Sequence, residues 1–192
     1  MLRRFTSVAC FILGCLGLVS IPAAAQQVVH ALTGTVSAVD AADKTVTLLQ
    51  DTGSSFVFND MTNAKTQISF DKKIHVETTD ADAFKKAGAY VIVFFYYGQG
   101  DARTVVALRN LGSGPFTSAV GTVTRFEGHE HSISITDETG AAQTFKIAED
   151  TVGEGGYGAV NGFKFQVQKG DHVRIVGSSA GGNLTALFIR QM

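Results

Sequence analysis

The stretch GTVSAVDAADKTVTLLQDTGSSFVF, residues 34–58, is followed 87 residues later by GTVTRFEGHEHSISITDETGAAQTF, residues 121–145. The two copies align without a gap. They share the opening Gly-Thr-Val, two central apolar positions, a Thr-Gly pair and the closing phenylalanine. A constant offset over this length is hard to obtain by chance, and internal repeats point to the architecture before any single element does. The sequence therefore indicates a tandem duplication of one β-rich unit.

Each copy has the pattern of a β-hairpin. Polar and apolar residues alternate over 45–49 and again over 132–136, which is typical of half-buried strands. Thr-Gly then predicts a tight turn in both copies. In the strand before, Val36 and Val39 are three residues apart rather than two, as are Val123 and Phe126. This slip in the alternation predicts a β-bulge in each copy, the feature that a strongly coiled strand needs.

The stretch YVIVFFYY, residues 90–97, is apolar on both faces when it is placed on a strand. A strand with water on one side should alternate. We expect one face to fill the first unit's core and the other to pack on the second unit or on an inserted helix. A homodimer interface and a stacking platform for sugars or bases are the alternatives. The residues of the predicted interaction surface are Phe95 and Tyr97.

These patterns predict an all-β protein of two tandem small antiparallel β-barrel (OB-like) units. Unit one would span residues 26–111 and unit two residues 116–192, with 112–115, Gly-Ser-Gly-Pro, as the linker. One short helix is expected from Asp80 to Ala87, where Thr79 or Asp80 can cap the start and Gly88 can end it. The second unit has a Gly-rich loop near this place, so the helix would be an insertion in the first unit.

The first 25 residues have the features of an export signal. Arg3 and Arg4 precede an apolar run, and small residues before and at Ala25 suit a signal peptidase. The apolar run is short for a membrane span, and no second run of that length follows. We expect cleavage near Ala25 and a mature chain in the periplasm or outside the cell, without a transmembrane segment. Lipidation at Cys15 is the competing interpretation.

Composition excludes several chemistries for the mature chain. Both cysteines, Cys10 and Cys15, lie in the predicted leader, so a disulfide framework, a thiolate zinc site and a cysteine nucleophile are excluded. The formal net charge is −1, and removal of two arginines with the leader lowers it to −3. That balance gives no electrostatic basis for nucleic-acid binding. The sequence indicates no cofactor.

Two histidines form the most ligand-like cluster. His129 and His131 would share a face of an extended segment, and neutral imidazoles bind zinc, copper or nickel. The cluster falls at a predicted hairpin tip, where two ligands make a weak site. His172 or Asp171 could supply a third ligand if the fold brings it near. His30 and His75 stand alone and are interpreted as surface residues.

Two motif matches lack the context that their chemistry requires. Residues 153–158, GEGGYG, fit a dinucleotide-binding pattern but have no helical period after them, which favours a flexible surface loop. Residues 177–181, GSSAG, fit a nucleophile elbow, but no acid or histidine follows Ser179, so a hairpin loop is expected. The candidate carboxylates for glycoside hydrolysis all read as turn or loop residues without an apolar setting: Glu127, Glu130, Glu138, Glu149 and Glu154.

The pattern Gly-Thr-Val, bulge, acidic turn, β-branched strand and Thr-Gly, followed by Gly170-Asp171-His172-Val173 and a final strand with Ala186, resembles a family. It is similar to exported bacterial domains of unknown function that form small β-barrels, often in tandem. Residues 121–189 carry the pattern best, whereas the first unit has Gly88-Ala89 in place of Gly-Asp. The resemblance implies a cell-envelope or secreted binding module and supplies no catalytic residues.

The functional hypothesis from the sequence is a non-catalytic envelope module that binds an unknown protein partner or itself. The first alternative is a metal-binding protein or metal-dependent enzyme that uses His129 and His131. The second is carbohydrate or oligonucleotide binding on a barrel face. The absence of tryptophan and the negative charge weigh against this second alternative.

Overall fold

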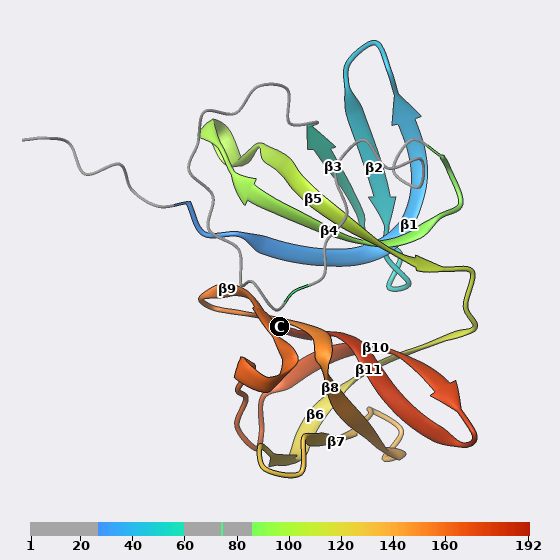
Figure 1. Ribbon diagram of the computed structural model, residues 1–192, viewed down its shortest axis with the longest axis vertical. Helices are drawn as coiled ribbons and strands as arrows, with labels where there is room; N and C mark the ends of the chain where they lie inside the picture. Colours follow the sequence, from blue (N-terminus) through green and yellow to red (C-terminus); the bar gives the residue numbers. More distant parts are fainter. Residues whose placement is uncertain (1–26, 60–73, 75–85) are drawn as a thin grey trace, which may run out of the picture.

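The computed structural model describes residues 27–59, 74 and 86–192. Over these residues the chain forms eleven strands and two single-turn 3-10 helices, η1 (Gln99–Asp101) and η2 (Gly162–Lys164), and no α-helix. None of the described residues belongs to a helix that could span a bilayer. Figure 1 shows two sheet-built units, one above the other, joined by a single connection. The all-β prediction is confirmed.

The first unit is a closed five-stranded barrel with the order β1-β2-β3-β5-β4. Its pairings are antiparallel except for β3 and β5, which meet in parallel at Asn59 and Thr104. The interior is filled by apolar side chains from every strand, including Leu48, Phe58 and Phe95. The strands are β1 (His30–Asp40), β2 (Thr45–Leu49), β3 (Ser55–Asn59), β4 (Tyr90–Tyr97) and β5 (Arg103–Gly112).

The second unit is a six-stranded sheet with the order β11-β10-β6-β7-β8-β9, and β11 also pairs in parallel with β8. Its own apolar core includes Ile133, Phe145 and Ile175. The strands are β6 (Phe116–Glu127), β7 (Ser132–Thr136), β8 (Ala142–Gly155), β9 (Gly158–Asn161), β10 (His172–Ala180) and β11 (Asn183–Gln191).

The predicted bulges are present in both units. The register of β1 against β2 shifts between Val36 and Ala38, and that of β6 against β7 shifts between Val123 and Arg125. The extra residue is Ser37 in one unit and Thr124 in the other, and each donates its hydroxyl hydrogen bond to a carbonyl of the next strand at 3.2 Å. A bulge bends and coils a strand, so the same local device curves both sheets.

In both hairpins a glycine lies where the backbone of the neighbouring strand approaches closely. A Cβ added to Gly34 would lie 2.5 Å from the carbonyl oxygen of Leu49, and one added to Gly121 would lie 2.6 Å from that of Thr136. Real Cβ atoms do not approach this closely, so each position requires the absence of a side chain. This explains why Gly opens both matched stretches.

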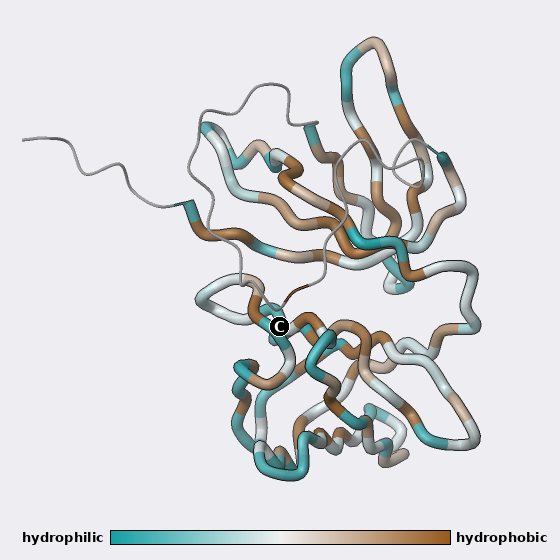
Figure 2. Tube along the Cα trace, viewed as in Figure 1, coloured by the Kyte–Doolittle hydropathy of each residue, from teal (hydrophilic) through white to brown (hydrophobic). Residues whose placement is uncertain are grey.

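Strand β4 contributes side chains to two hydrophobic cores, as its two apolar faces predict. Val91, Val93 and Phe95 point into the first unit's barrel. Ile92 and Phe94 belong to a separate buried cluster, hereafter the junction, that draws on both units. Figure 2 shows hydrophobic segments in both units on the sides where they meet. The junction consists of Val29, Ala31, Ile74, Tyr90, Ile92, Phe94, Ala107, Val152, Val176 and Phe188.

The other predictions for the first unit and the linker have mixed outcomes. The expected helix, Asp80–Ala87, lies outside the described residues apart from Lys86 and Ala87, which form a bend and a turn. Residues 113–115 connect β5 to β6, within the predicted linker. At its end, Phe116 stacks on Tyr90 with ring centroids 4.8 Å apart, so the connection is anchored against the junction.

Candidate functional site: the junction and a groove on the second unit

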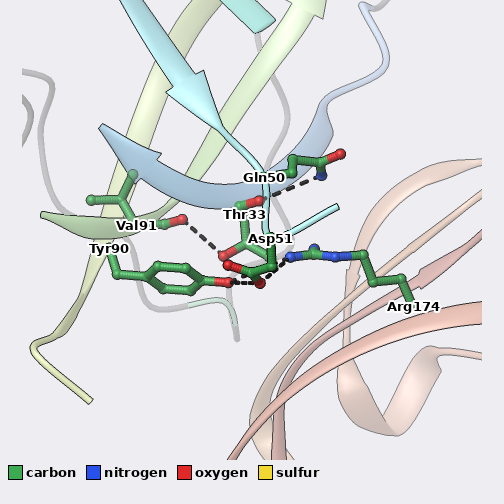
Figure 3. A network of polar contacts seen from close by, with 6 residues as sticks. All are labelled: Thr33, Gln50, Asp51, Tyr90, Val91 and Arg174. Carbon is green, nitrogen blue, oxygen red and sulfur yellow. Dashed lines mark hydrogen bonds and ion pairs between the residues drawn. The ribbon is translucent and has the colours of Figure 1, made fainter. Parts of the chain in front are cut away.

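A buried charge of the second unit reaches across the junction to a turn of the first. Arg174, near the start of β10, is 2% exposed, and its Nη2 donates a hydrogen bond to Oδ2 of Asp51 at 2.7 Å. The Tyr90 hydroxyl donates to the same oxygen at 2.7 Å, as Figure 3 shows. Desolvation by burial and the hydrogen bond to Asp51 raise the pKa of Tyr90 to about 12. Charge-assisted bonds of this kind are among the stronger ones in proteins.

The polar contacts extend into the first barrel. Thr33 is fully buried and donates its hydroxyl hydrogen bond to the carbonyl of Val91 at 2.9 Å, and Gln50 donates to the carbonyl of Thr33 at 3.4 Å. Within the described chain, two buried nitrogens of Arg174, Nε and Nη1, make no hydrogen bond. A buried guanidinium with one carboxylate partner is costly unless that partner stays in place. The buried Arg174 therefore depends on Asp51, across the junction, for its carboxylate partner.

A second polar contact crosses the junction at the start of β1. Nδ1 of His30 lies 2.7 Å from Oε1 of Glu154, and the backbone N–H of Ala31 donates to Oε2 of Glu154 at 2.8 Å. Glu154 is 7% exposed, and this burial raises the pKa of its carboxyl, although the hydrogen bonds from His30 and Ala31 oppose the shift. The predictions that His30 stands alone and that Glu154 is a loop residue without an apolar setting are therefore wrong, whereas His75 lies outside the described residues.

The hairpin that carries Glu154 is held by both units. The motif GEGGYG is ordered strand for the most part: β8 extends to Gly155, β9 begins at Gly158, and only Gly156 and Tyr157 form the turn. The N–H of Ala159 donates to the carbonyl of Val29 at 2.7 Å. A Cβ on Gly158 would lie 2.5 Å from that same carbonyl oxygen. The β8–β9 hairpin is therefore fixed against the start of β1, and the expectation of a flexible loop is wrong.

A groove of about 820 Å³ lies beside this hairpin on the second unit. One wall is the β8–β9 turn and the other is the extended segment 164–168, which η2 positions. The side chain of Asn161 accepts a hydrogen bond from the N–H of Lys164 at 3.2 Å and caps η2. Phe165 and Val167 are buried in the second unit's core, so the alternate side chains of this segment face outward. The lining includes Tyr157, Phe165, Gln166, Gln168, Asp171 and Gln191.

The predicted histidine cluster is not gathered into one site. The His131 ring stacks on Phe163 with centroids 4.0 Å apart and lines a smaller concavity of about 220 Å³. His129 is exposed, and His172 lies 3.4 Å from the Thr122 hydroxyl. Over residues 27–59, 74 and 86–192, no three His, Cys, Asp or Glu side chains are placed to share a metal ion.

The two residues of the predicted interaction surface lie on the same face of β4, with ring centroids 5.3 Å apart, but differ in burial. Phe95 is 2% exposed inside the first barrel, where its ring meets that of Phe58 at 5.1 Å. Its assignment to a surface is therefore wrong. Tyr97 is 40% exposed near the end of β4 and packs edge-on against His30 at 5.1 Å. The period-two pattern separated the faces of β4 correctly but did not show that both are buried up to Phe95 and that the strand reaches solvent only at its end.

Residues 177–180 of the GSSAG motif form the end of β10, and only Gly181 belongs to the turn before β11, so the expected loop is mostly strand. A comparison of the chain with known proteins gives no matching family model and no curated relative. The assignment of function therefore rests on the geometry of the junction and the groove.

Proposed function

We propose that the chain is an exported, non-catalytic cell-envelope module that presents a binding groove on a body made of two joined units. The observation that carries this proposal is the junction. Its apolar cluster is flanked by two polar contacts, each with one buried partner, Arg174 with Asp51 and Glu154 with His30. The buried Arg174 and Glu154 are each engaged with a side chain of the first unit, which suits a structural role. The hairpin they hold forms one wall of the groove.

In this proposal the two units are duplicated small barrels of OB-like type. The matched bulges, the matched glycine approaches and the shared hairpin registers support a common origin. The parallel pairing of β11 with β8 supports a closed arrangement in the second unit as well. Small barrels of this type bind ligands on a face or at a mouth, because closure leaves few edges to protect.

The export of the chain and the class of its partner are inferred from the sequence. The Arg-led apolar stretch and the small residues before Ala25 support cleavage there and a periplasmic or extracellular location. A net charge of −3 after cleavage favours a partner other than nucleic acid. The partner is bound at the groove, whose side chains face solvent, rather than at Phe95.

The test has two readouts. The full chain is expressed in a bacterium and fractionated, and the N-terminus of the recovered protein is sequenced. We expect protein in the periplasmic or envelope fraction that begins at residue 26. The purified mature chain is then sedimented with isolated cell envelopes, where we expect saturable retention. Protein that keeps residues 1–25 in the cytoplasm, or retention that never saturates, would contradict the proposal.

A further inference from the structure

The groove contains an aromatic side chain without an internal role. Tyr157 is 97% exposed at the tip of the β8–β9 hairpin, far more than any other tyrosine or phenylalanine among the described residues. Its neighbours Gly156 and Gly158 have no side chains to shield it, and the hairpin beneath it is fixed by Glu154 and Val29. A rigidly mounted aromatic ring in water gains free energy when a ligand covers its face.

The polar part of the groove is made of amides. Gln166 and Gln168 are exposed on the segment opposite Tyr157, and Gln191 closes one end. Gln191 Nε2 donates to Asp171 Oδ2 at 3.0 Å, and the N–H of Gln168 donates to the same oxygen at 2.8 Å, which steadies this end. A primary amide both donates and accepts hydrogen bonds, and so does a hydroxyl group. The wall therefore suits a ligand rich in hydroxyls.

The charges of the residues that line the groove limit the class of ligand further. The charged residues that line the groove are Lys164 and Asp171, whose charges are opposite. Such a site neither attracts a polyanion nor holds a polycation. Its volume of about 820 Å³ falls in the range of about 300–1,000 Å³ for small-molecule sites.

We propose that this groove binds a neutral oligosaccharide, with Tyr157 stacked on a sugar ring and the glutamines hydrogen-bonded to its hydroxyls. This inference deepens the proposed function, because it rests on the groove being the binding surface of the module. It also gives the carbohydrate alternative from the sequence a location, on the second unit rather than on β4. Peptides and acidic glycans are the competing ligand classes.

The test is titration calorimetry of the mature chain with three neutral tetrasaccharides, cellotetraose, maltotetraose and chitotetraose, and with tetragalacturonate as an acidic match of the same size. An unstructured glycine-serine peptide serves as the peptide probe. We expect at least one neutral tetrasaccharide to bind and tetragalacturonate to bind at least tenfold more weakly. Loss of stacking in Tyr157→Ala should weaken binding roughly tenfold.

Two variants make the result specific. Tyr157→Phe keeps the ring and should bind within about threefold of the parent chain, since the face of the ring makes the contact. Tyr97→Ala removes an exposed ring from the first unit and should leave binding unchanged. Because Tyr157 is almost fully exposed, neither of its two substitutions should be accompanied by a loss of thermal stability.

Several results would overturn the inference. They are no binding of any neutral tetrasaccharide, tighter binding of tetragalacturonate or the peptide, or equal binding by Tyr157→Ala. These results would leave export and saturable envelope retention intact. Conversely, a chain that binds the neutral probe but is not exported would contradict the proposed function and not this inference.

Discussion

Strands β4 and β10 occupy the same place in the two units but bury different chemistry. Thr35 pairs with Tyr90 in the first unit and Thr122 with His172 in the second, so the registers match. Two positions along, Ile92 is fully buried in one strand and Arg174 is 2% exposed in the other. The same strand position can thus bury a branched alkyl chain or a guanidinium. The difference is that Arg174 needs a carboxylate from the opposite unit.

The interiors differ at a second matched position. Phe95 of β4 corresponds to Gly177 of β10, because their partners His30 and Thr117 are 87 residues apart. In the first unit Phe58 and Phe95 meet edge-on. In the second, a Cβ on Gly177 would lie 3.0 Å from the ring of Phe145, which occupies the space instead. The first unit thus fills this part of its core with two phenylalanine rings, and the second with one ring packed against a glycine.

The largest expected effect separates the barrel interior from the exposed end of the same face of β4. Phe95→Lys places a charge inside the barrel, and we expect a loss of more than about 4 kcal/mol of unfolding free energy, enough to prevent folding. Tyr97→Lys, two residues away and 40% exposed, should change stability by less than about 1 kcal/mol. Urea unfolding followed by circular dichroism measures both. Similar losses from the two variants would contradict the assignment of Phe95 to the barrel interior and of Tyr97 to its exposed end.

The Asp51–Arg174 contact is tested by a double-mutant cycle. Asp51→Ala leaves a buried guanidinium without its carboxylate and should cost about 3 kcal/mol. Arg174→Met removes the charge itself and should cost less than about 1 kcal/mol, because the matched position of the first unit holds the apolar side chain of Ile92. The double variant should be close to Arg174→Met. Additive losses would show that the two side chains are not coupled.

Gly177→Ala should destabilise the chain by about 2 kcal/mol, because its Cβ would lie 2.8 Å from the carbonyl oxygen of Thr185 and 3.0 Å from the Phe145 ring. Ser179→Ala, an exposed position in the same strand, is the control and should be nearly neutral. Thermal unfolding of both variants gives the comparison. A neutral Gly177→Ala would mean that the second core has free space at this point.

The smallest effect concerns pH. Burial raises the pKa of Glu154 above its ordinary value of 4.5, so the native state binds this proton more tightly than the unfolded chain does. Its contribution to stability is fully present below that ordinary value and is lost as the pH rises through the raised pKa. Glu154→Gln cannot titrate and should therefore gain stability relative to the parent as the pH rises. Melting temperatures between about pH 4 and pH 7 measure this, and a constant difference would contradict it.

Much of the fold could be predicted because its signals are local. The bulges at Ser37 and Thr124, the paired turns and the two apolar faces of β4 depend on residues close together in the chain. The site depends on how the two units meet. Nothing near Arg174 shows that Asp51 lies opposite, since the two are 123 positions apart.

The strands formed by the GEGGYG segment were not predicted from the sequence for a related reason. Its glycines are typical of a flexible loop, but they allow the close approach of Phe165 at Gly153 and of Val29 at Gly158. The partner segments that make it a strand come from β11 and from the start of β1. A glycine-rich stretch followed by paired apolar residues, here Ala159-Val160, was the available signal for a hairpin.

The central claim is that the junction joins both units into one cooperative body. Differential scanning calorimetry of the mature chain tests it most directly, alone and with Asp51→Ala. We predict a single transition with equal calorimetric and van't Hoff enthalpies, moved as a whole to lower temperature by the substitution. Two resolved transitions, or a shift confined to one of them, would contradict the claim.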